Sequence, residues 1–335
     1  MSDLDVDLLL VGAGPVGLYG AYYAGVRGLR TVVVDSLPEP GGQITAMYPE
    51  KPIYDVAGFP SVRGRDLVEG LVHQAARYDP TYLLGDSAVS LVREADGRLL
   101  VGTEAGQVVR CGAVVVTGGI GTFTPRPLPA GEEFLGRGLA YFVPRLADYA
   151  GLDVVIVGGG DSACDWTLAL LPVARSVTLV HRRKAFRAHA ASVDAVLASA
   201  ATVIIDAELS QILGADRVDA VEIATKGARP RTVPCQAVVA ALGFLADLGP
   251  VRDWGLELHD NRHLVVDTRM QTNLPGVYAA GDIIDYDGKV RLISVGFGEV
   301  ATAVNNAAVQ LDPAAQLFPG HSTDSVPVPT PVPAA

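Results

Sequence analysis

Two glycine-rich segments of the sequence have the residue types and spacing of phosphate-binding turns. One is Gly12-Ala13-Gly14-Pro15-Val16-Gly17, and the other is Gly158-Gly159-Gly160-Asp161-Ser162-Ala163. In the first, Gly12 permits a tight turn, Gly14 lets the backbone approach a pyrophosphate, and Gly17 lets a helix pack closely on a strand. The helix that follows would present free N–H groups and a partial positive charge to the phosphates. Both segments therefore predict dinucleotide binding, with glycines that serve only as turns as the alternative.

The residues that follow each turn distinguish the two expected ligands. Asp35 stands 23 residues after Gly12, where a carboxylate can accept hydrogen bonds from an adenosine ribose. The residue at the same distance in the second unit is His181, and the sequence continues Arg182-Arg183-Lys184-Ala185-Phe186-Arg187. Arginines accommodate a ribose 2′-phosphate through charge-assisted hydrogen bonds. The first site is thus predicted to be FAD-like and the second NADPH-like, and a solvated basic loop is the alternative for the cations.

The elements that must position these residues repeat along the chain. Buried apolar runs predict strands at residues 6–11 and 31–35 in the first unit, and at 153–157 and 176–180 in the second. A helical stretch lies between the two strands of each unit. Near the end, residues 296–307 predict a helix of small residues whose N-terminus faces a flavin.

Two further strands indicate how the units are nested. VVVTGGIG (114–121) and AVVAALGF (237–244) each end in small residues, where backbone can pass close to a cofactor. We therefore predict an α/β protein with two nested, three-layer Rossmann-like domains, the NADPH-binding domain being inserted into the FAD-binding domain. The expected bounds are 1–123 and 246–324 for the FAD-binding domain, 124–245 for the NADPH-binding domain, and 325–335 for a disordered Pro-rich tail.

Composition and charge narrow the class of protein. The 335 residues are 49% hydrophobic and 19% charged, as in a soluble enzyme of about two domains. No apolar run reaches the ~18 residues of a membrane span, and the N-terminus lacks the features of a signal peptide, so a cytoplasmic location is expected. The net charge of −11 argues against nucleic acid, and residues 124–245, with 12 basic and 12 acidic residues, contribute none of the excess.

Several motifs together make the chain resemble the thioredoxin-reductase-like flavoproteins. Within that group it looks most like the ferredoxin/flavodoxin–NADP reductases, over about residues 5–324. The paired glycine motifs are shared by many flavoproteins, whereas three other segments are much more specific. These are GGQITAMYPEKPIYDVAGFP, GFGEVATAVNN and PGHST.

One absence separates this chain from the thioredoxin reductases it resembles. Those enzymes carry a CxxC just before the second glycine motif, where this chain reads YFVPRLADYAGLDVVIVGGG. Cys111, Cys164 and Cys235 are widely spaced, and a lone buried cysteine usually behaves as a small hydrophobe. Electrons are therefore expected to leave the flavin directly, to a one-electron carrier such as ferredoxin or flavodoxin.

The resemblance also implies residue roles at both sites. Gly12, Gly14 and Pro15 would lie at the FAD pyrophosphate and Asp35 at its ribose, while Gly281 and Asp282 would lie near the ribityl and phosphate groups. Gln43, after Gly42, and Tyr48 would contact the isoalloxazine, Val89 the adenine, and Phe123 the flank of the cofactor. His321 would cover the opposite flavin face, with Ser322 and Thr323 near its reactive edge. NADPH would rest on Gly160, Asp161, Ser162 and Ala163, with Arg182 and Arg187 at the 2′-phosphate and His181 and Arg183 as second choices.

These roles predict a reaction without a conventional catalytic side chain and without a metal. A hydride would pass from NADPH to FAD, and electrons would then leave singly to the carrier. The sequence leaves open whether the inserted domain rotates for turnover, and the resemblance implies a homodimer. The alternatives are a reductase of another acceptor (a quinone, oxygen or a disulfide held by a partner) and a low-turnover flavin redox sensor.

Overall fold

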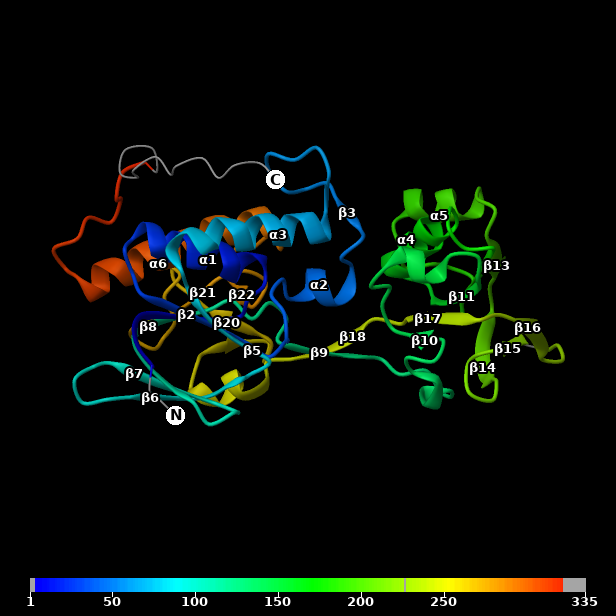
Figure 1. The fold of residues 1–335 in the computed structure, drawn as a ribbon, viewed down its shortest axis with the longest axis horizontal. Helices are drawn as coiled ribbons and strands as arrows, with labels where there is room; N and C mark the ends of the chain where they lie inside the picture. Colours follow the sequence, from blue (N-terminus) through cyan, green and yellow to red (C-terminus); the bar gives the residue numbers. More distant parts are fainter. Residues whose placement is uncertain (1–3, 226, 322–335) are drawn as a thin grey trace.

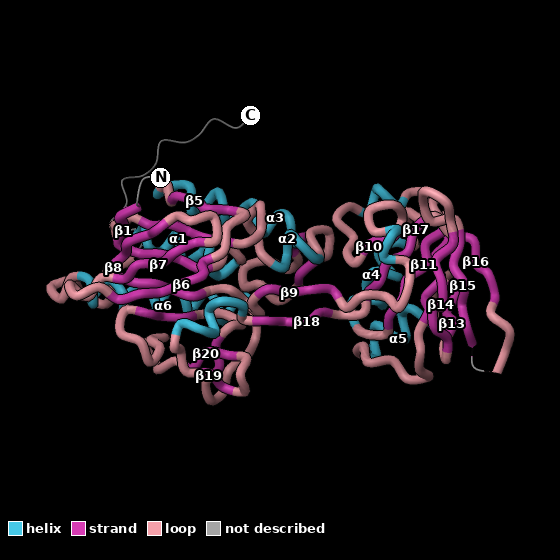
Figure 2. The backbone as a smooth tube through the Cα atoms, turned by 90° about the horizontal axis from the view of Figure 1, so that it is seen from below, coloured by secondary structure: helices cyan, strands magenta, loops and turns pink. Residues whose placement is uncertain are grey.

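The protein consists of two parts, each built on its own sheet, which is mixed in the first part and parallel in the second (Figure 1). The structure is a computed structural model that describes residues 4–225 and 227–321. The chain crosses from the first part to the second along β9 (Thr122–Pro125) and returns along β18 (Phe244–Asp247). These two strands pair antiparallel and form the ribbon between the parts in Figure 2.

The first part is organised around β1 (Leu4–Val11), a strand whose Leu8, Leu9 and Leu10 are fully buried. It pairs in parallel with β2 (Thr31–Asp35) on one side and β8 (Val108–Val116) on the other. The rest of this sheet comprises β5 (Thr81–Leu84), β6 (Ala88–Arg93), β7 (Leu99–Thr103) and β21 (Val277–Ala279), in the order β5-β2-β1-β8-β7-β6 with β21 also paired to β8.

Helices cover one face of this sheet and a smaller sheet covers the other, which gives three layers. The helical face holds α1 (Pro15–Val26), α3 (Gly64–Ala75) and α6 (Ile293–Leu311). The other face packs on η4 (Gly249–Trp254) and on the sheet of β19 (Leu258–His259), β20 (His263–Val265) and β22 (Ile284–Asp285). Four short elements complete this part. They are α2 (Gln43–Met47), η1 (Ala76–Tyr78), and β3 (Pro52–Ile53) and β4 (Val62–Arg63), which form a hairpin.

The second part repeats the three-layer design with different outer layers. Its parallel sheet has the order β10 (Leu139–Ala140), β17 (Ala237–Ala241), β11 (Asp153–Gly158), β12 (Ser176–Val180) and β13 (Thr202–Ile204). One face carries α4 (Asp161–Leu170) and α5 (Ala190–Leu197), and η2 (Glu132–Phe134) and η3 (Leu146–Tyr149) lie in the segment before β11. The other face packs on the antiparallel sheet of β14 (Ala207–Leu213), β15 (Ala220–Thr225) and β16 (Arg231–Pro234).

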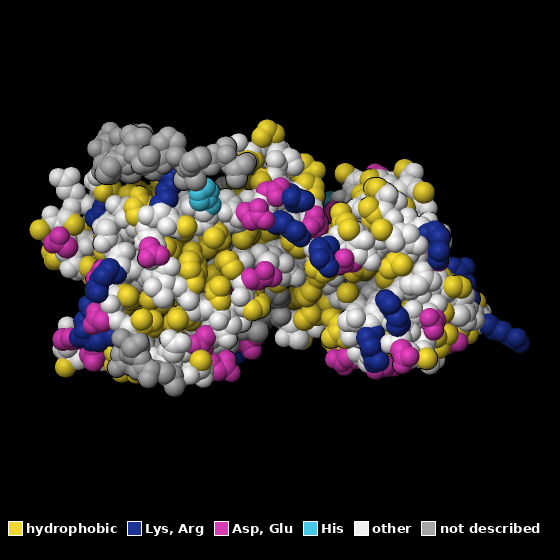
Figure 3. Space-filling view, in the orientation of Figure 1, with side chains coloured by type: hydrophobic (Ala, Val, Ile, Leu, Met, Phe, Trp, Pro, Cys, Tyr) yellow, Lys and Arg dark blue, Asp and Glu magenta, His cyan; other side chains and the backbone are white. Residues whose placement is uncertain are grey.

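A small set of side chains bridges the two parts beside α2. Lys51 forms an ion pair with Asp165 of α4, and Arg65 donates a long hydrogen bond of 3.4 Å to the Pro144 carbonyl. Tyr48, at the end of α2, packs against the hydrophobic core of the second part. Charged side chains of both signs gather beside this junction (Figure 3). The two parts therefore touch through side chains as well as through the β9–β18 ribbon.

The predicted α/β fold with two nested dinucleotide-binding units is confirmed. The predicted helix at 296–307 is longer than expected, since α6 runs from Ile293 to Leu311. No helix within residues 4–225 and 227–321 is both long enough and apolar enough to cross a bilayer. The predicted tail at 325–335 lies outside the described residues.

Candidate cofactor site

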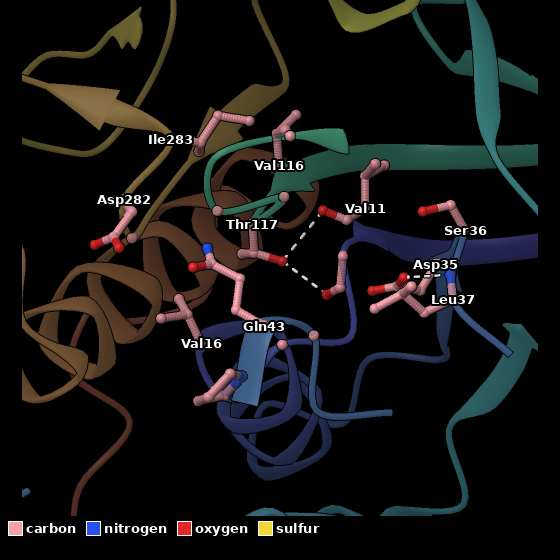
Figure 4. Close-up of a pocket in the computed structure, with 18 of the residues that line it drawn as sticks. Val11, Val16, Asp35, Ser36, Leu37, Gln43, Val116, Thr117, Asp282 and Ile283 are labelled. Carbon is pink, nitrogen blue, oxygen red and sulfur yellow. Dashed lines mark hydrogen bonds between the residues drawn. The ribbon is translucent and has the colours of Figure 1, made fainter. Parts of the chain in front are cut away.

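An elongated pocket lies at the carboxyl ends of β1, β2 and β8 in the first part. Asp35, Ser36 and Leu37 lie at one end, and Asp282 and Ile283 lie at the other, with Thr117 between them (Figure 4). Most residues predicted for the first site line it. They are Gly12, Gly14, Pro15, Asp35, Gly42, Gln43, Tyr48, Gly281 and Asp282.

The middle of the pocket is a glycine turn at the start of α1. Gly12 has a φ of 116°, and a Cβ atom there would lie 2.7 Å from the Thr117 carbonyl, so both conformation and space require glycine. A Cβ atom at Gly14 would meet no protein atom within 4 Å. Because Gly14 lines the pocket, that open space lets a ligand approach the backbone directly. Pro15 occupies the first helical turn, where its missing N–H costs no hydrogen bond.

The Asp35 carboxylate lies at the end of β2 and is anchored by backbone. It accepts hydrogen bonds from the N–H of Ala13 at 2.5 Å and of Leu37 at 2.8 Å. Burial raises the pKa of Asp35, and these two backbone hydrogen bonds act in the opposite direction. Asp35 thus fixes the glycine turn and at the same time faces the pocket as a hydrogen-bond acceptor.

The opposite end of the pocket combines polar side chains with an aromatic ring. Burial, with the Asp282 and Asp55 carboxylates nearby, raises the pKa of Tyr48 to about 12. The same causes keep its phenol neutral. Burial also raises the pKa of Asp282 above its ordinary value. Gln43 reaches toward Gly119, where a Cβ atom would lie 3.0 Å from the Gln43 side-chain nitrogen. This end can therefore hold a flat polar ring between a tyrosine and hydrogen-bonding groups.

Four residues predicted for the first site are not placed in the pocket lining. Val89 lies in β6, next to the lining residue Ala88. Phe123 belongs to β9, and its side chain is not described. His321 is exposed, and its ring contacts that of Phe318 edge-on at a centroid distance of 5.3 Å. Thr323, with Ser322, lies outside the described residues. The structure therefore brings the glycine, acid and Gln43–Tyr48 residues together but does not place His321 with them.

The second glycine turn lies at the carboxyl end of β11. A Cβ atom at Gly160 would meet nothing within 4 Å, and α4 begins at Asp161. Asp161 accepts a hydrogen bond from the His189 N–H at 2.8 Å, and Ser162 is exposed while Ala163 is buried. The backbone N–H of Arg187 donates to the Gly159 carbonyl at 2.7 Å, so the cationic loop is tied to the turn.

His181 has a structural role within this loop. Its ring stacks on Phe186 at 4.8 Å, forms a 3.1 Å hydrogen bond with the Ala185 carbonyl, and is buried. A Cβ atom at Gly159 would lie 2.0 Å from the ring, so glycine is needed to make room for it. Arg182, Arg183 and Arg187 are exposed, and their side chains form no ion pair with any other described residue. They therefore remain available to an anionic ligand.

All three cysteines are buried and free. Burial raises the pKa of Cys111 and of Cys235 to about 12, and it also raises the pKa of Cys164. Because the thiolate is the reactive form, these thiols are poor nucleophiles at neutral pH. Within the described residues, no group of three or more His, Cys, Asp or Glu side chains is placed to hold a metal ion.

Residues 6–307 match the family described as pyridine nucleotide-disulphide oxidoreductase, and this match covers both glycine turns. The chain belongs to this family. A ferredoxin–NADP reductase from Salinispora tropica is 62% identical over 320 residues, which are 96% of this chain and 99% of that protein. A ferredoxin–NADP reductase from Nocardioides sp. is 63% identical over 324 residues, which are 96% of this chain and 98% of that protein.

Solved structures with the same fold include thioredoxin reductases. That from T. acidophilum has a TM-score of 0.76 and 24% identity, covering 93% of this chain and all of the other. That from Lactococcus lactis has a TM-score of 0.75 and 22% identity, covering 91% and 99%. The resemblance inferred from the motifs is confirmed at the level of both the fold and the named relatives.

Several pocket residues of this family member were not predicted from the sequence. Asp86, Ser87 and Ala88 line the Asp35 end, and Leu292 and Ile293 line the Asp282 end. The first group follows β5, which pairs with β2, so the end of β5 lies beside the end of β2. An apolar strand after α3, ended by Gly85 and Asp86, is the signal that could have found them.

Proposed function

We propose that this protein is a flavin-containing ferredoxin–NADP reductase, which uses FAD and NADPH. The observation that carries the proposal is the pair of glycine turns in one chain, the first followed by an anchored acid and the second by unpaired arginines. Relatives that match 96% of the chain at 62–63% identity carry the same name.

The pocket of the first part fits FAD. The open space beside Gly14 and the N-terminus of α1 suit a pyrophosphate, and Asp35 offers an acceptor to the ribose hydroxyls. Gln43, Tyr48 and Asp282 would hold the isoalloxazine end. The unpaired arginines after β12 fit the 2′-phosphate that distinguishes NADPH from NADH.

Bound FAD would supply the redox chemistry, by taking up a hydride from NADPH and releasing electrons one at a time. The chain contributes position and electrostatics. The neutral Tyr48 phenol would cover one side of the flavin end, and Asp282 would hold its ribityl side. Ser162 and Trp166 of the second part and Tyr48 of the first line one small cavity at the junction of the two parts.

Direct electron exit follows from the state of the cysteines. A disulfide relay needs two thiols close together, and Cys111, Cys164 and Cys235 lie in β8, in α4 and before β17. All are buried with raised pKa values. A carrier that accepts single electrons from the flavin itself is therefore the acceptor that this site suits.

Three finer features belong to the same proposal. Flavodoxin would serve as an alternative carrier to ferredoxin, the protein would be a homodimer, and it would act in the cytoplasm. The free, buried cysteines suit a reducing compartment.

Stopped-flow reduction and reoxidation of the flavin tests the function. NADPH should reduce the bound FAD rapidly, and ferredoxin should reoxidise it more rapidly than oxidised thioredoxin does. A variant with all three cysteines changed to serine or alanine should keep both rates per bound FAD. Fast reduction of thioredoxin that is lost in the cysteine-free variant would instead establish a disulfide reductase. Turnover with oxygen or a quinone alone would establish a different acceptor.

A further inference from the structure

A buried cluster of charged and polar side chains lies directly behind the Asp282 end of the pocket. The Lys289 ammonium donates to both carboxylate oxygens of Glu299, at 2.5 and 2.7 Å. The Lys289 side chain is 2% exposed and that of Glu299 is 5% exposed. Glu299 also accepts hydrogen bonds from the Tyr286 hydroxyl at 2.6 Å and from the Gly281 N–H at 2.9 Å.

Both side chains of this ion pair are buried. In every other ion pair of the described residues, one side chain is more than a third exposed or both side chains are partly exposed. Burying two charges removes their hydration, and a buried pair often adds little net stability compared with apolar residues of similar size. A contribution to folding is therefore a weak reason for these residues. The hydrogen bond to Gly281 suggests a function connected with the pocket.

The cluster connects three segments that meet at the pocket. Glu299 belongs to α6, whose first residue, Ile293, lines the pocket together with Leu292. Gly281 and Asp282 line the same end. Gly281 has a φ of 86°, so the turn needs glycine there and its N–H is held only by the carboxylate. Lys289 lowers the pKa of Asp282, while burial and Glu299 raise it, so the pair acts electrostatically on a pocket carboxylate.

The Tyr286 hydroxyl completes the set of donors to Glu299. Its hydrogen bond to the carboxylate raises the pKa of Tyr286 to about 12, so it remains a donor at neutral pH. The Lys289 ammonium also lies 5.6 Å from the centre of the Tyr286 ring. The nearby Arg291 is paired with Asp285 at 3.0 Å, outside the cluster. Within the cluster, Lys289 and Glu299 are therefore paired directly, and Glu299 bonds directly to the Gly281–Asp282 turn.

We propose that Lys289 and Glu299 are a positioning pair for the flavin. Glu299 fixes the Gly281–Asp282 turn, and Lys289 balances the charge of Glu299. Together they set the relative affinity of the pocket for oxidised and reduced flavin. This inference rests on the proposed function, since it assumes that the flavin end of FAD lies beside Asp282. Two-electron reduction with uptake of one proton makes the isoalloxazine one unit more negative. A charge left unpaired behind this end must then favour one redox state over the other.

The two members of the pair should therefore have effects of opposite sign on the flavin potential. Glu299→Gln keeps an oxygen for the Gly281 N–H but leaves the Lys289 ammonium unpaired, so the reduced flavin is favoured and the midpoint potential rises. Lys289→Met leaves the Glu299 carboxylate unpaired, and the midpoint potential falls. A change of about tenfold in the relative affinity for the two states corresponds to ~30 mV for a two-electron couple. The double variant should return close to the unaltered value.

The measurement is spectroelectrochemical titration of the purified holoprotein, with the dissociation constant of FAD as a second readout. Loss of packing alone would move both single variants in the same direction, and such a result, or no shift in either, overturns the proposal. If Glu299→Gln fails to retain FAD, two measurements still test the sign of the charge effect. These are the fall of the midpoint potential in Lys289→Met and its return in the double variant.

Two controls separate this charge effect from general changes. Tyr286→Phe removes a hydrogen bond to Glu299 without changing charge, so it should weaken FAD binding and leave the potential within about 10 mV, or about twofold in relative affinity. Arg145→Met with Asp148→Asn removes an exposed ion pair in the second part and should change neither readout. Failure of the proposed function appears separately, as an unaltered protein that binds no FAD or does not oxidise NADPH.

Discussion

Asp35 serves two purposes with one carboxylate. Its oxygens hold the N–H groups of Ala13 and Leu37, and its exposed side faces the pocket. In the proposed function the acid would therefore support the turn that holds the pyrophosphate and would also be a ribose ligand. Substitution should affect the whole adenosine half of the site.

Asp35→Ala should raise the dissociation constant of FAD by tenfold or more. Hydrogen bonds to a charged group contribute about 1.5–3 kcal/mol, and a loss of ~1.4 kcal/mol is a factor of ten. Recovery of FAD fluorescence on dilution measures the constant. Ser36→Ala, at the neighbouring lining position, is the control and should change it little. An unchanged constant in Asp35→Ala would place the ribose elsewhere.

A second prediction at the residue scale concerns Arg182 and Arg187. Neither side chain is paired with another described residue, so both can bind a 2′-phosphate. The unaltered enzyme should prefer NADPH over NADH by at least tenfold in kcat/KM, which needs only ~1.4 kcal/mol. Changing both arginines to alanine should remove most of that preference and leave NADH kinetics nearly unchanged. Arg175→Ala, in an exposed ion pair away from the turn, is the matched control. Equal use of NADH by the unaltered enzyme would contradict the assignment.

The sequence predicted residues that line the pocket where one local motif determines their position. Asp35 is predictable because the strand–turn–helix–strand unit fixes its distance from Gly12. His181 occupies the corresponding position, but its ring is buried against Phe186 and Gly159, which requires knowledge of packing. The Lys289–Glu299 pair was also not predictable, since a loop and a helix meet there only in three dimensions.

At the scale of elements, parallel strands place the residues after β1, β2, β5 and β8 at one edge of the sheet. Strand locations were predictable from apolar runs, and β12 at Ser176–Val180 is one example. The start of α6 was not, because Leu292 at its N-cap position offers no capping side chain and hence no sequence signal. The helix therefore begins three residues earlier than predicted, at Ile293, which lines the pocket.

Asp153 and Arg175 join the starts of β11 and β12 and provide a prediction for pH dependence. The Arg175 guanidinium and the Ser176 hydroxyl lower the pKa of Asp153 to about 2, from 3.8. A depressed carboxylate pKa adds stability above its unfolded value, and that contribution is lost as pH falls through the folded value. Asp153→Asn should lower the free energy of unfolding at pH 7 by about 1 kcal/mol. This value is reduced for solvent screening, because the Arg175 side chain is largely exposed.

Urea unfolding of Asp153→Asn and of the unaltered protein, between pH 7 and pH 3, checks this expectation. The difference between the two proteins should be constant above about pH 5 and should shrink as pH falls below 4. Ser210→Ala, which removes an exposed hydrogen bond without a titrating group, should show no such dependence. A difference that grows toward pH 3 would contradict the sign.

At the scale of the whole molecule, the arrangement of the two parts depends on the ribbon and on the contact beside α2. Lys51 pairs with Asp165, and these residues line the same small cavity as Tyr48 and Ser162. This contact lies between Tyr48, which lines the first pocket, and Ser162 of the second glycine turn. The sequence predicted the nesting from repeated motifs, but it could not predict this junction, because Lys51 and Asp165 meet only through the three-dimensional arrangement of the two parts.

Restricting this junction should slow hydride transfer. In Lys51→Cys/Asp165→Cys, a short bismaleimide linker would hold the two parts in the arrangement of Figure 1. Flavin reduction by NADPH, followed by stopped flow, should slow at least tenfold, while reduction by dithionite should not change. The unlinked double variant is the control for loss of the ion pair. Full speed after linkage would show that hydride transfer occurs in this arrangement.

The position of β21 and α6 has a consequence for the order in which the protein matures. The first sheet is incomplete until Val277–Ala279 pairs with β8, and α1 lacks its neighbour until Ile293–Leu311 has been made. The second part is contiguous between β9 and β18, so all of its strands emerge from the ribosome earlier. Since domains fold as units during synthesis, the nicotinamide-binding part should be complete first, while the N-terminal segment waits with an uncovered sheet face. Flavin capture is thereby deferred until β21 and α6 have been made and have joined the N-terminal strands and helix.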